Sequence, residues 1–326
     1  MPPVVARGRL AWASLHGAVA RRALAGAALV ALGAAAGFLA AEHSTAPSGL
    51  AADAAGANPL EAIARAHRGR VLWKWPQYFA PYHRELSALR HARRTTGGAV
   101  LIEIGVNTGG AIDLWREYFG GALAYHGVDL NPKTAVHRDE ANGVHVHVGA
   151  QDDGAFLREV VAAAGGRVDV VVDDGSHLGK LSVASFAHLW EALADDGGIY
   201  IIEDIHTSQA EEVLSLAARA AAAANALDTH FLEKREPPDD ECALVVRGAA
   251  RDSDAGESGS GGELRLGGFC RQAYRVSIYH GMVVFEKRAF SIQEAKMYGD
   301  IDAFEDHPSD YFMTSWWKEL NTNLNP

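Results

Sequence analysis

Two pairs of acidic residues follow two apolar segments that are predicted to be strands. The run DDGSH, residues 173–177, comes directly after one segment, and EDIH, residues 203–206, comes after the other. Neighbouring strands of a sheet lie about 5 Å apart, so we expect these four carboxylates to crowd one small volume. Like charges so close are costly unless they are protonated or neutralised by a cation. A hard divalent ion such as Mg²⁺ takes oxygen ligands of this kind. Helix capping is the alternative, above all for Asp173.

Histidines near these acids are candidates for proton transfer. His177 lies three residues after Asp174, in the turn above the same crevice. Because a histidine titrates near neutrality, His177 is the candidate general base. For His206 we favour a positioning or packing role. We expect His145 and His147 to be exposed on one strand face rather than to ligate a metal.

A glycine-rich turn predicts a cofactor site. The run EIGVNTGG, residues 103–110, follows a predicted buried strand and opens a helix. Glycines there let the backbone approach a ligand and expose amide groups at a helix N-terminus. The spacing is not the G-x-G-x-x-G of dinucleotide sites. Asp129, at the end of the second predicted strand, could accept hydrogen bonds from both hydroxyls of a ribose. A purely structural tight turn is the alternative.

The elements that position these residues alternate along the chain. Alternation of strands and helices implies parallel βαβ units. We predict an α/β fold with a doubly wound, mostly parallel, Rossmann-like sheet, a C-terminal antiparallel hairpin and an N-terminal hydrophobic helix. The predicted strands are residues 99–104, 123–130, 144–148, 168–172 and 199–202, with the hairpin at 274–279 and 282–287; the predicted helices are 112–119, 156–164, 180–194 and 209–225.

Composition excludes several classes of protein. Apolar residues make up 48% of the 326 residues and charged residues 22%, which excludes wholesale disorder. Residues 1–41 carry four of the 30 basic side chains and none of the 41 acidic ones. The rest is therefore strongly acidic and unsuited to nucleic acid. Two cysteines exclude a disulfide scaffold and a zinc-finger array. A single Cys242–Cys270 disulfide is possible in a secretory lumen, and the sequence leaves this open.

Residues 23–41 form a targeting or anchoring segment. All nineteen are Ala, Leu, Val, Gly or Phe, close to the roughly 20 that cross a bilayer. Arg21 and Arg22 precede them and Glu42 is the first acid after them. The positive-inside rule predicts a single-pass signal anchor with the body lumenal, of the ER or Golgi type. The alternatives are a cleaved organelle transit peptide, a cleaved signal peptide and a helix of a soluble domain.

Residues 74–287 resemble the metal-dependent sugar O-methyltransferases of the macrocin and mycinamicin type, together with bacterial proteins labelled cephalosporin-hydroxylase-like. The motifs D-D-G-S-H and E-D-x-H-T-S, in order and about thirty residues apart, carry most of the resemblance. The turn at 103–109 resembles the E-x-G-x-G-x-G of class I S-adenosylmethionine (SAM) methyltransferases. Further matching segments are Lys74-Trp75, Tyr78-Phe79 with Tyr82, WREYF at 115–119, GVD at 127–129 and GAQDD at 149–153.

The resemblance implies SAM and Mg²⁺ as cofactors. It implies that Asp174, Glu203 and Asp204 hold Mg²⁺ and that His177 takes the proton from the acceptor hydroxyl. Three departures stand out: Asn107 replaces a glycine, DGG at 196–198 stands where Pro-Gly-Gly is usual, and residues 252–262 form an atypical insert. The expected cofactor-binding residues are Glu103, Gly105, Asn107, Gly109, Asp129, Gln151, Asp153 and Asp173.

These observations predict a SAM-dependent, metal-assisted O-methyltransferase with a small-molecule or glycan acceptor. A vicinal diol would chelate the ion through both oxygens, which favours sugars and catechols. An NAD-linked oxidoreductase on the same fold and a non-catalytic membrane-tethered scaffold are the alternatives, and a homo-oligomer is possible. The expected organisation is a leader and hydrophobic segment at 1–41, a flexible stem at 42–58, the methyltransferase domain at 59–290 with 252–262 as a surface loop between two strands, and a tail at 291–326.

Overall fold

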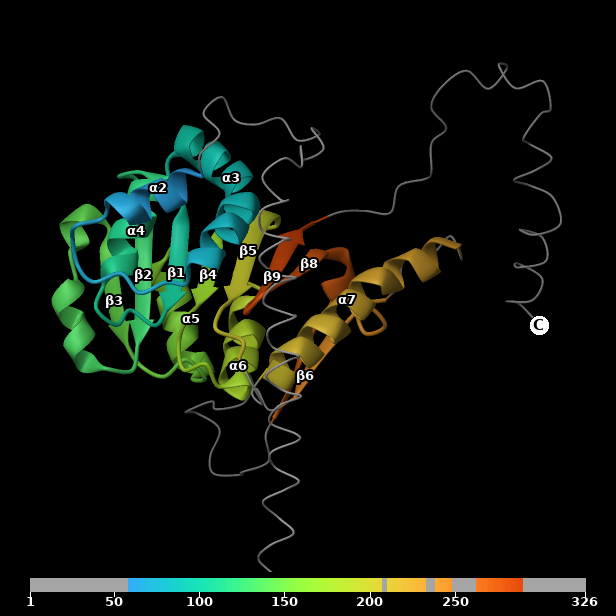
Figure 1. The fold of residues 1–326 in the computed structure, drawn as a ribbon. Coiled ribbons are helices and arrows are strands. Elements are labelled where there is room, and N and C mark those ends of the chain that lie inside the picture. Colours follow the sequence, from blue (N-terminus) through green and yellow to red (C-terminus); the bar gives the residue numbers. More distant parts are fainter. Residues whose placement is uncertain (1–57, 207–209, 233–237, 248–261, 290–326) are drawn as a thin grey trace, which may run out of the picture. The chain divides into compact units, whose positions relative to one another are not determined.

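A seven-stranded sheet forms the centre of the computed structural model, which describes residues 58–206, 210–232, 238–247 and 262–289 (Figure 1). The strand order is β3-β2-β1-β4-β5-β9-β8. The first five strands are parallel, whereas β9 pairs antiparallel with β5 and with β8. The predicted doubly wound sheet with a C-terminal antiparallel hairpin is therefore confirmed. The strands are β1 (Val100–Ile104), β2 (Ala124–Asp129), β3 (Val144–Val148), β4 (Val170–Asp173), β5 (Asp196–Ile202), β8 (Ala273–Tyr279) and β9 (Met282–Arg288).

Helices cover both faces of this sheet (Figure 1). One apolar core joins the sheet to α5 (Gly154–Ala163), α6 (Gly179–Leu189) and α7 (Ala210–Leu232). A second core joins the opposite face to α2 (Pro59–Ala66), α3 (Phe79–Thr96) and α4 (Gly110–Phe119). Successive residues of a strand point to opposite faces. Because both faces are covered, the central strands are apolar at nearly every position. The acidic residues that follow these strands also point alternately to one face and to the other.

Helices α2 and α3 and strands β6 and β7 were not predicted. Helix α3 buries Phe79, Tyr82, Leu86 and Leu89 along one side. Strands β6 (Leu244–Arg247) and β7 (Glu263–Leu266) pair antiparallel as a separate two-stranded sheet. They flank the predicted surface insert, most of which lies outside the described residues, as do the hydrophobic segment 23–41 and the tail 291–326. No described helix is long and apolar enough to cross a membrane.

Cys242 and Cys270 form a disulfide, a pairing that the sequence left open. Both residues are buried. The bond links the segment before β6 to the short 3-10 helix η6 (Phe269–Arg271), which contacts α7. It therefore ties the small sheet to the helical layer over the main one.

Three histidines gather on the edge strand β3 and its neighbour β2, and the expectation of an exposed pair on β3 is wrong. His145 and His147 are half-buried and pack against the buried His126 of β2. The ring centroids lie 4.7 Å apart for His126 and His145, and Nδ1 of His126 lies 3.2 Å from Nε2 of His147. Burial, with the neighbouring His145, lowers the pKa of His126 from 6.5 to about 4.

This lowered pKa makes the fold sensitive to acid. Because the unfolded chain binds the proton more readily, the contribution of His126 to stability is complete above about pH 6.5 and is lost as the pH falls toward 4, by up to about 3 kcal/mol. We expect His126→Gln to reduce the loss of unfolding free energy between pH 7 and pH 4.5 in urea titrations. The exposed His91 supplies the control variant His91→Gln, which should behave as wild type. An unchanged pH dependence in His126→Gln would contradict this assignment.

Candidate active site

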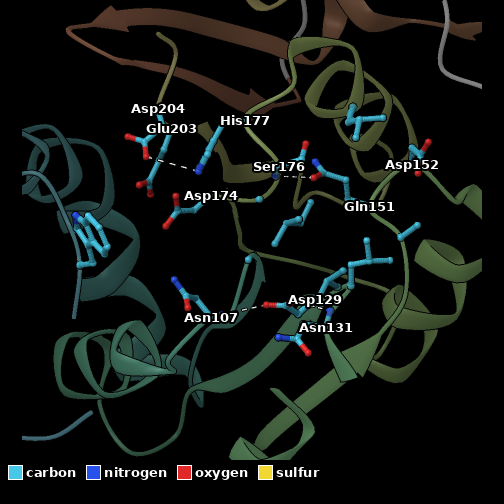
Figure 2. A pocket seen from close by; sticks show the side chains of 18 of the residues that line it. Asn107, Asp129, Asn131, Gln151, Asp152, Asp174, Ser176, His177, Glu203 and Asp204 are labelled. Carbon is cyan, nitrogen blue, oxygen red and sulfur yellow. Dashed lines mark hydrogen bonds and ion pairs between the residues drawn. The ribbon is translucent and has the colours of Figure 1, made fainter. Parts of the chain in front are cut away.

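A cavity of about 700 Å³ opens at the C-terminal ends of the parallel strands. This is where sheets of this type bind ligands. Its walls come from the loops after β1 to β5 and from residues 73–78, which precede α3. Asp174, His177, Glu203 and Asp204 lie on one side of the cavity, whereas Asn107, Asp129 and Asn131 lie on another (Figure 2). The fold thus brings both predicted halves of the site into one space.

Backbone strain is concentrated in this cavity. Asn107, His177 and Asp204 have φ angles of 47°, 56° and 54°, and no other non-glycine residue in the described ranges has a positive φ. All three line the cavity. Left-handed backbone costs free energy in residues with a Cβ and clusters at functional sites. The strain therefore marks these three loops independently of any motif.

Gly105 is required where two of these loops meet. Its φ is 92°, and an added Cβ would lie 2.0 Å from the carbonyl oxygen of Asp174. The turns after β1 and β4 can approach this closely only because the residue has no side chain. Gly105 lines the cavity, as predicted. Gly109 instead starts α4 with a φ of 78° and does not line it.

Asp174, His177 and Asp204 form the group that could hold a metal ion. One ligand atom from each lies within 4.8 Å of the others. The sequence predicted Asp174 and Asp204 together with Glu203, but Glu203 is buried and accepts hydrogen bonds from Tyr82 and Lys74. The two carboxylates of the group suit a hard divalent ion. His177 lies 3.8 Å from Asp204, measured from Nε2 to Oδ2, and remains the predicted base.

Lys74 is the residue that sequence reasoning gave no role. Its Nζ lies 2.5 Å from Oδ2 of Asp174, 3.0 Å from Oε2 of Glu203 and 3.9 Å from Oε1 of Glu103. Only 3% of the side chain is exposed. Burial alone would lower the pKa of Lys74, but the carboxylates of Glu203 and Asp174 outweigh it and raise the pKa above its usual value. The ammonium group of Lys74 therefore lies among the carboxylates of Asp174, Glu203 and Glu103.

Glu103 lies behind this cluster rather than in the cavity wall. It is fully buried and accepts hydrogen bonds from Nε1 of Trp115 at 3.0 Å and from the Tyr125 hydroxyl at 2.5 Å. Burial raises the pKa of Glu103, and Lys74 acts against this effect. Any influence of Glu103 on a cofactor is therefore indirect, through Lys74.

Asp129 holds the glycine turn in place. Its Oδ2 accepts hydrogen bonds from the amides of Val106 and Asn107, each at 3.0 Å. Its Oδ1 accepts one from the amide of Asn131 at 2.8 Å. A carboxylate has about four acceptor positions, so one remains toward the cavity that Asp129 lines. We expect it to serve one ribose hydroxyl rather than the two predicted from sequence.

Gln151 lines the cavity but its side chain is engaged by the protein. Its Oε1 accepts from the amide of Ser176 at 2.9 Å, and its Nε2 donates to Ser185 at 3.0 Å and to Oδ1 of Asp173 at 3.2 Å. Asp173 lies buried beneath the cavity, where burial raises its pKa to about 7. Asp153 caps α5 through the amides of Ala155 and Phe156. Neither Asp173 nor Asp153 lines the cavity, so the contacts with a cofactor that were predicted for these two residues do not fit the structure. Asp152 lines the cavity instead.

Tyr78, Trp75 and His206 complete the side of the cavity that carries the candidate metal ligands. The Tyr78 hydroxyl donates to Oδ1 of Asp204 at 2.7 Å. Nε2 of His206 lies 3.4 Å from the same oxygen. The His206 ring meets Trp75 edge to face, with centroids 6.1 Å apart. His206 was predicted to position or pack, and the structure places it in the cavity wall beside Asp204.

No protein-family model matches the chain. It is 36% identical over 165 residues to the 8-demethyl-8-alpha-L-rhamnosyl tetracenomycin-C 2'-O-methyltransferase of Streptomyces olivaceus, covering 48% of this chain and 40% of that protein. It is 33% identical over 144 residues to the demethylmacrocin O-methyltransferase of Streptomyces fradiae, covering 42% and 34%. It is also 35% identical over 115 residues to the mycinamicin VI 2''-O-methyltransferase of Micromonospora griseorubida, covering 33% and 27%.

The matched segments span less than half the length of each of these relatives. Over them the chain resembles macrocin-type and mycinamicin-type O-methyltransferases, which confirms the resemblance predicted from the motifs. Among solved structures, the mycinamycin-pathway methyltransferase MycE in complex with Mg, SAH and mycinamycin VI has a TM-score of 0.47 at 22% identity, covering 65% of this chain and 49% of that one. A SAM-dependent O-methyltransferase of Thermotoga maritima has a TM-score of 0.33 at 12% identity, covering 72% and 73%.

Proposed function

We propose that this chain is a SAM-dependent O-methyltransferase that uses a divalent ion to methylate a sugar hydroxyl. One observation carries the proposal: the acidic residue at the end of β2 and the Asp174–His177–Asp204 group line the same 700 Å³ cavity. A methyl donor on one side and an acceptor hydroxyl on the other can then meet in line. Resemblance to O-methyltransferases over about half of the chain supports it.

Each residue of the site has a separate role in the proposed reaction. SAM already carries a good leaving group, so the protein must align the acceptor and remove its proton. His177 accepts that proton, and the carboxylate of Asp204, 3.8 Å away, stabilises the imidazolium that forms. Asp204 is itself held by the Tyr78 hydroxyl. Mg²⁺ bound by Asp174 and Asp204 would lower the pKa of the acceptor hydroxyl.

Cofactor binding separates this proposal from its alternatives. We expect isothermal titration to detect S-adenosylhomocysteine (SAH) binding and no NAD binding. Asp129→Asn should weaken SAH affinity by at least about tenfold, because it removes a charged acceptor from the ribose and loosens the turn. Asp153→Asn is the matched control, since asparagine also caps helices and residue 153 does not line the cavity. Preferential binding of NAD would favour the oxidoreductase, and binding of neither cofactor would favour the scaffold.

We further propose that residues 23–41 anchor the protein, with its body in a lumen. The apolar composition of this segment and the basic residues before it support an anchor. The Cys242–Cys270 disulfide supports an oxidising compartment for the body. A cleaved transit peptide is the alternative.

Deleting residues 1–41 should give an enzyme that no longer sediments with membranes and keeps its catalytic constants. The reason is that every residue lining the cavity lies at or after Trp73, beyond the small and polar stem. Immunoblots against both ends of the full chain after membrane fractionation check the anchor. An anchor predicts a full-length chain in the carbonate-washed pellet, whereas a transit peptide predicts a shortened chain that carbonate releases. A full-length chain in the soluble fraction would contradict both.

A further inference from the structure

We propose that His126, His145 and His147 form a second metal site, which takes a transition-metal ion such as Zn²⁺ and fastens strand β3 to strand β2. The inference goes beyond the proposed function and does not depend on it. His126 lies in β2, and the other two histidines lie in the edge strand β3. The proposed methyl transfer uses none of these three side chains, and none of them lines the cavity.

The parallel pairing of β2 with β3 brings the three imidazoles together. His126 stands opposite His145 in the register, and His147 follows His145 by two residues. Residues two apart in a strand point to the same face, so all three side chains lie on one face of the sheet. The ring centroids lie 4.7 Å apart for His126 and His145 and 5.4 Å apart for His126 and His147. The ring of His126 therefore packs against both of its neighbours.

Two of the imidazole nitrogens already have the spacing of two ligands on one ion. Nδ1 of His126 lies 3.2 Å from Nε2 of His147. Zinc binds histidine nitrogen at about 2.0–2.1 Å with tetrahedral geometry, which separates two ligand nitrogens by about 3.3 Å. Without an ion, one of the two nitrogens carries a proton and donates it to the other. A metal ion can replace this proton after a small rotation of each ring.

His145 can supply a third nitrogen. Its ring is stacked on that of His126, with 19° between the planes, and the residue is half-buried rather than enclosed. Its side chain is therefore free to rotate toward an ion that enters from the edge of the sheet. Three histidines with water in the fourth position are an established zinc coordination. The site would thus stay open to water rather than be closed by four protein ligands.

The surroundings keep these imidazoles neutral, as metal ligands must be. Burial, with the neighbouring His145 and His147, lowers the pKa of His126 to about 4. Burial, followed by the charges of His145 and Arg138, also lowers the pKa of His147. At neutral pH the ring nitrogens therefore offer lone pairs for which protons do not compete. The charge of Arg138 also repels a cation, so we expect micromolar rather than nanomolar affinity.

The ligand type separates this site from the group in the cavity. Imidazole suits Zn²⁺, Cu²⁺ and Ni²⁺, whereas carboxylates and water suit Mg²⁺. The Asp174–His177–Asp204 group offers two carboxylates and favours Mg²⁺. Zinc titrated against excess Mg²⁺ should therefore report on the three histidines, and Asp174→Ala checks that it does.

An ion at this site would stabilise the part of the sheet behind the cavity. His126 lies three residues before Asp129, at the end of β2. The carbonyl oxygen of Asp129 accepts a hydrogen bond at 3.0 Å from the amide of Gly149, which follows β3. A ligand that binds only the folded chain raises its stability. We therefore expect zinc to raise the melting temperature.

The test uses full-length protein without a polyhistidine tag, freed of metal with EDTA and desalted into excess Mg²⁺. Zinc affinity is measured by competition with a chromogenic chelator, coordination by the visible absorption of Co²⁺ in place of zinc, and stability by thermal unfolding. The variants are His126→Gln, His145→Gln and His147→Gln. The controls are His91→Gln, which changes an exposed histidine of α3, and Asp174→Ala, which changes the other metal group.

We expect wild type and both controls to bind one zinc ion at the three histidines, and each of the three variants to bind it at least about tenfold more weakly. Co²⁺-loaded wild type should show the strong visible absorption of tetrahedral coordination, and His147→Gln should lose it. Zinc should raise the melting temperature of wild type by several degrees and that of His147→Gln much less. Because His147 is only half-buried, His147→Gln decides the question even if His126→Gln impairs folding.

Two outcomes would overturn the inference. Equal zinc affinity in wild type and His147→Gln would show that the three histidines pack together without binding metal. Loss of the bound zinc in Asp174→Ala, with the histidine variants unaffected, would assign the ion to the cavity. Neither outcome would contradict the methyltransferase proposal, which SAH binding tests separately.

Discussion

Replacing Lys74 by methionine will lower the free energy of unfolding by about 3–5 kcal/mol, because removal of one partner leaves buried carboxylates without their counter-ion. Nζ of Lys74 contacts Asp174 and Glu203 directly and lies 3.9 Å from Glu103. The side chains of Glu103 and Glu203 are at most 1% exposed. Water therefore cannot replace the ammonium. Urea unfolding of wild type and Lys74→Met measures the loss.

A double variant separates lost charge from lost packing. Lys74→Met with Glu203→Gln removes one charge of each sign and should recover most of the stability, since both partners are then neutral. Millimolar Mg²⁺ should stabilise Lys74→Met more than wild type, because the ion then takes the place of the missing ammonium beside Asp174. Equal stability of Lys74→Met and wild type would show that the ammonium is not the counter-ion of this cluster.

Asp174→Ala and Glu203→Ala will have different effects although the sequence gives both the same role. Asp174 belongs to the metal group and its side chain is 21% exposed, whereas Glu203 is buried between Lys74 and Tyr82. Asp174→Ala should abolish the dependence on divalent ions together with nearly all turnover, because Mg²⁺ demands a nearly complete octahedral shell. Its SAH affinity should stay close to that of wild type, and its melting temperature should fall less than that of Glu203→Ala, because the more deeply buried Glu203 still pairs with Lys74.

Glu203→Ala should instead lower stability by several kcal/mol, because it leaves Lys74 with fewer partners. Manganese titration followed by electron paramagnetic resonance, with thermal unfolding of each variant, makes the comparison. Asp153→Asn again serves as the control. Loss of metal binding in Glu203→Ala at wild-type stability would restore Glu203 to the ligand set predicted from sequence.

Much of the fold was predictable because the buried strands are continuous apolar runs between turn residues. The hairpin was predictable from His280-Gly281, where Gly281 has a φ of 75°. Helix α3 was missed although its buried residues recur every three or four positions, a pattern that basic residues interrupt. The pairing of β6 with β7 spans the atypical insert, and no local pattern encodes it.

The sequence predicted which loops form the candidate site, but not which contacts the residues of these loops make. The alternation of side chains along a strand would have distinguished Glu203 from Asp173. The side chain of Glu203, after β5, points to the α3 face of the sheet, where it meets Tyr82. The side chain of Asp173, at the end of β4, points to the α6 face, where it meets Gln151. The positive φ angles of His177 and Asp204, which help place both side chains in the cavity, have no sequence signature. Lys74 could not have been found locally, since its burial depends on carboxylates from three separate segments, namely strand β1 and the turns that follow β4 and β5.

Transfer of a labelled methyl group tests the central claim most directly. Purified full-length protein is incubated with SAM carrying a deuterated methyl group, Mg²⁺ and p-nitrophenyl α-L-rhamnoside or β-D-glucoside, and the products are analysed by mass spectrometry. We predict a glycoside that gains one deuterated methyl group on a hydroxyl oxygen of the sugar, with the product lost in excess EDTA and in His177→Ala. Full product formation in EDTA, or with His177→Ala, would contradict the mechanism, and no transfer to any glycoside or diol by protein that binds SAH would contradict the assignment as an O-methyltransferase.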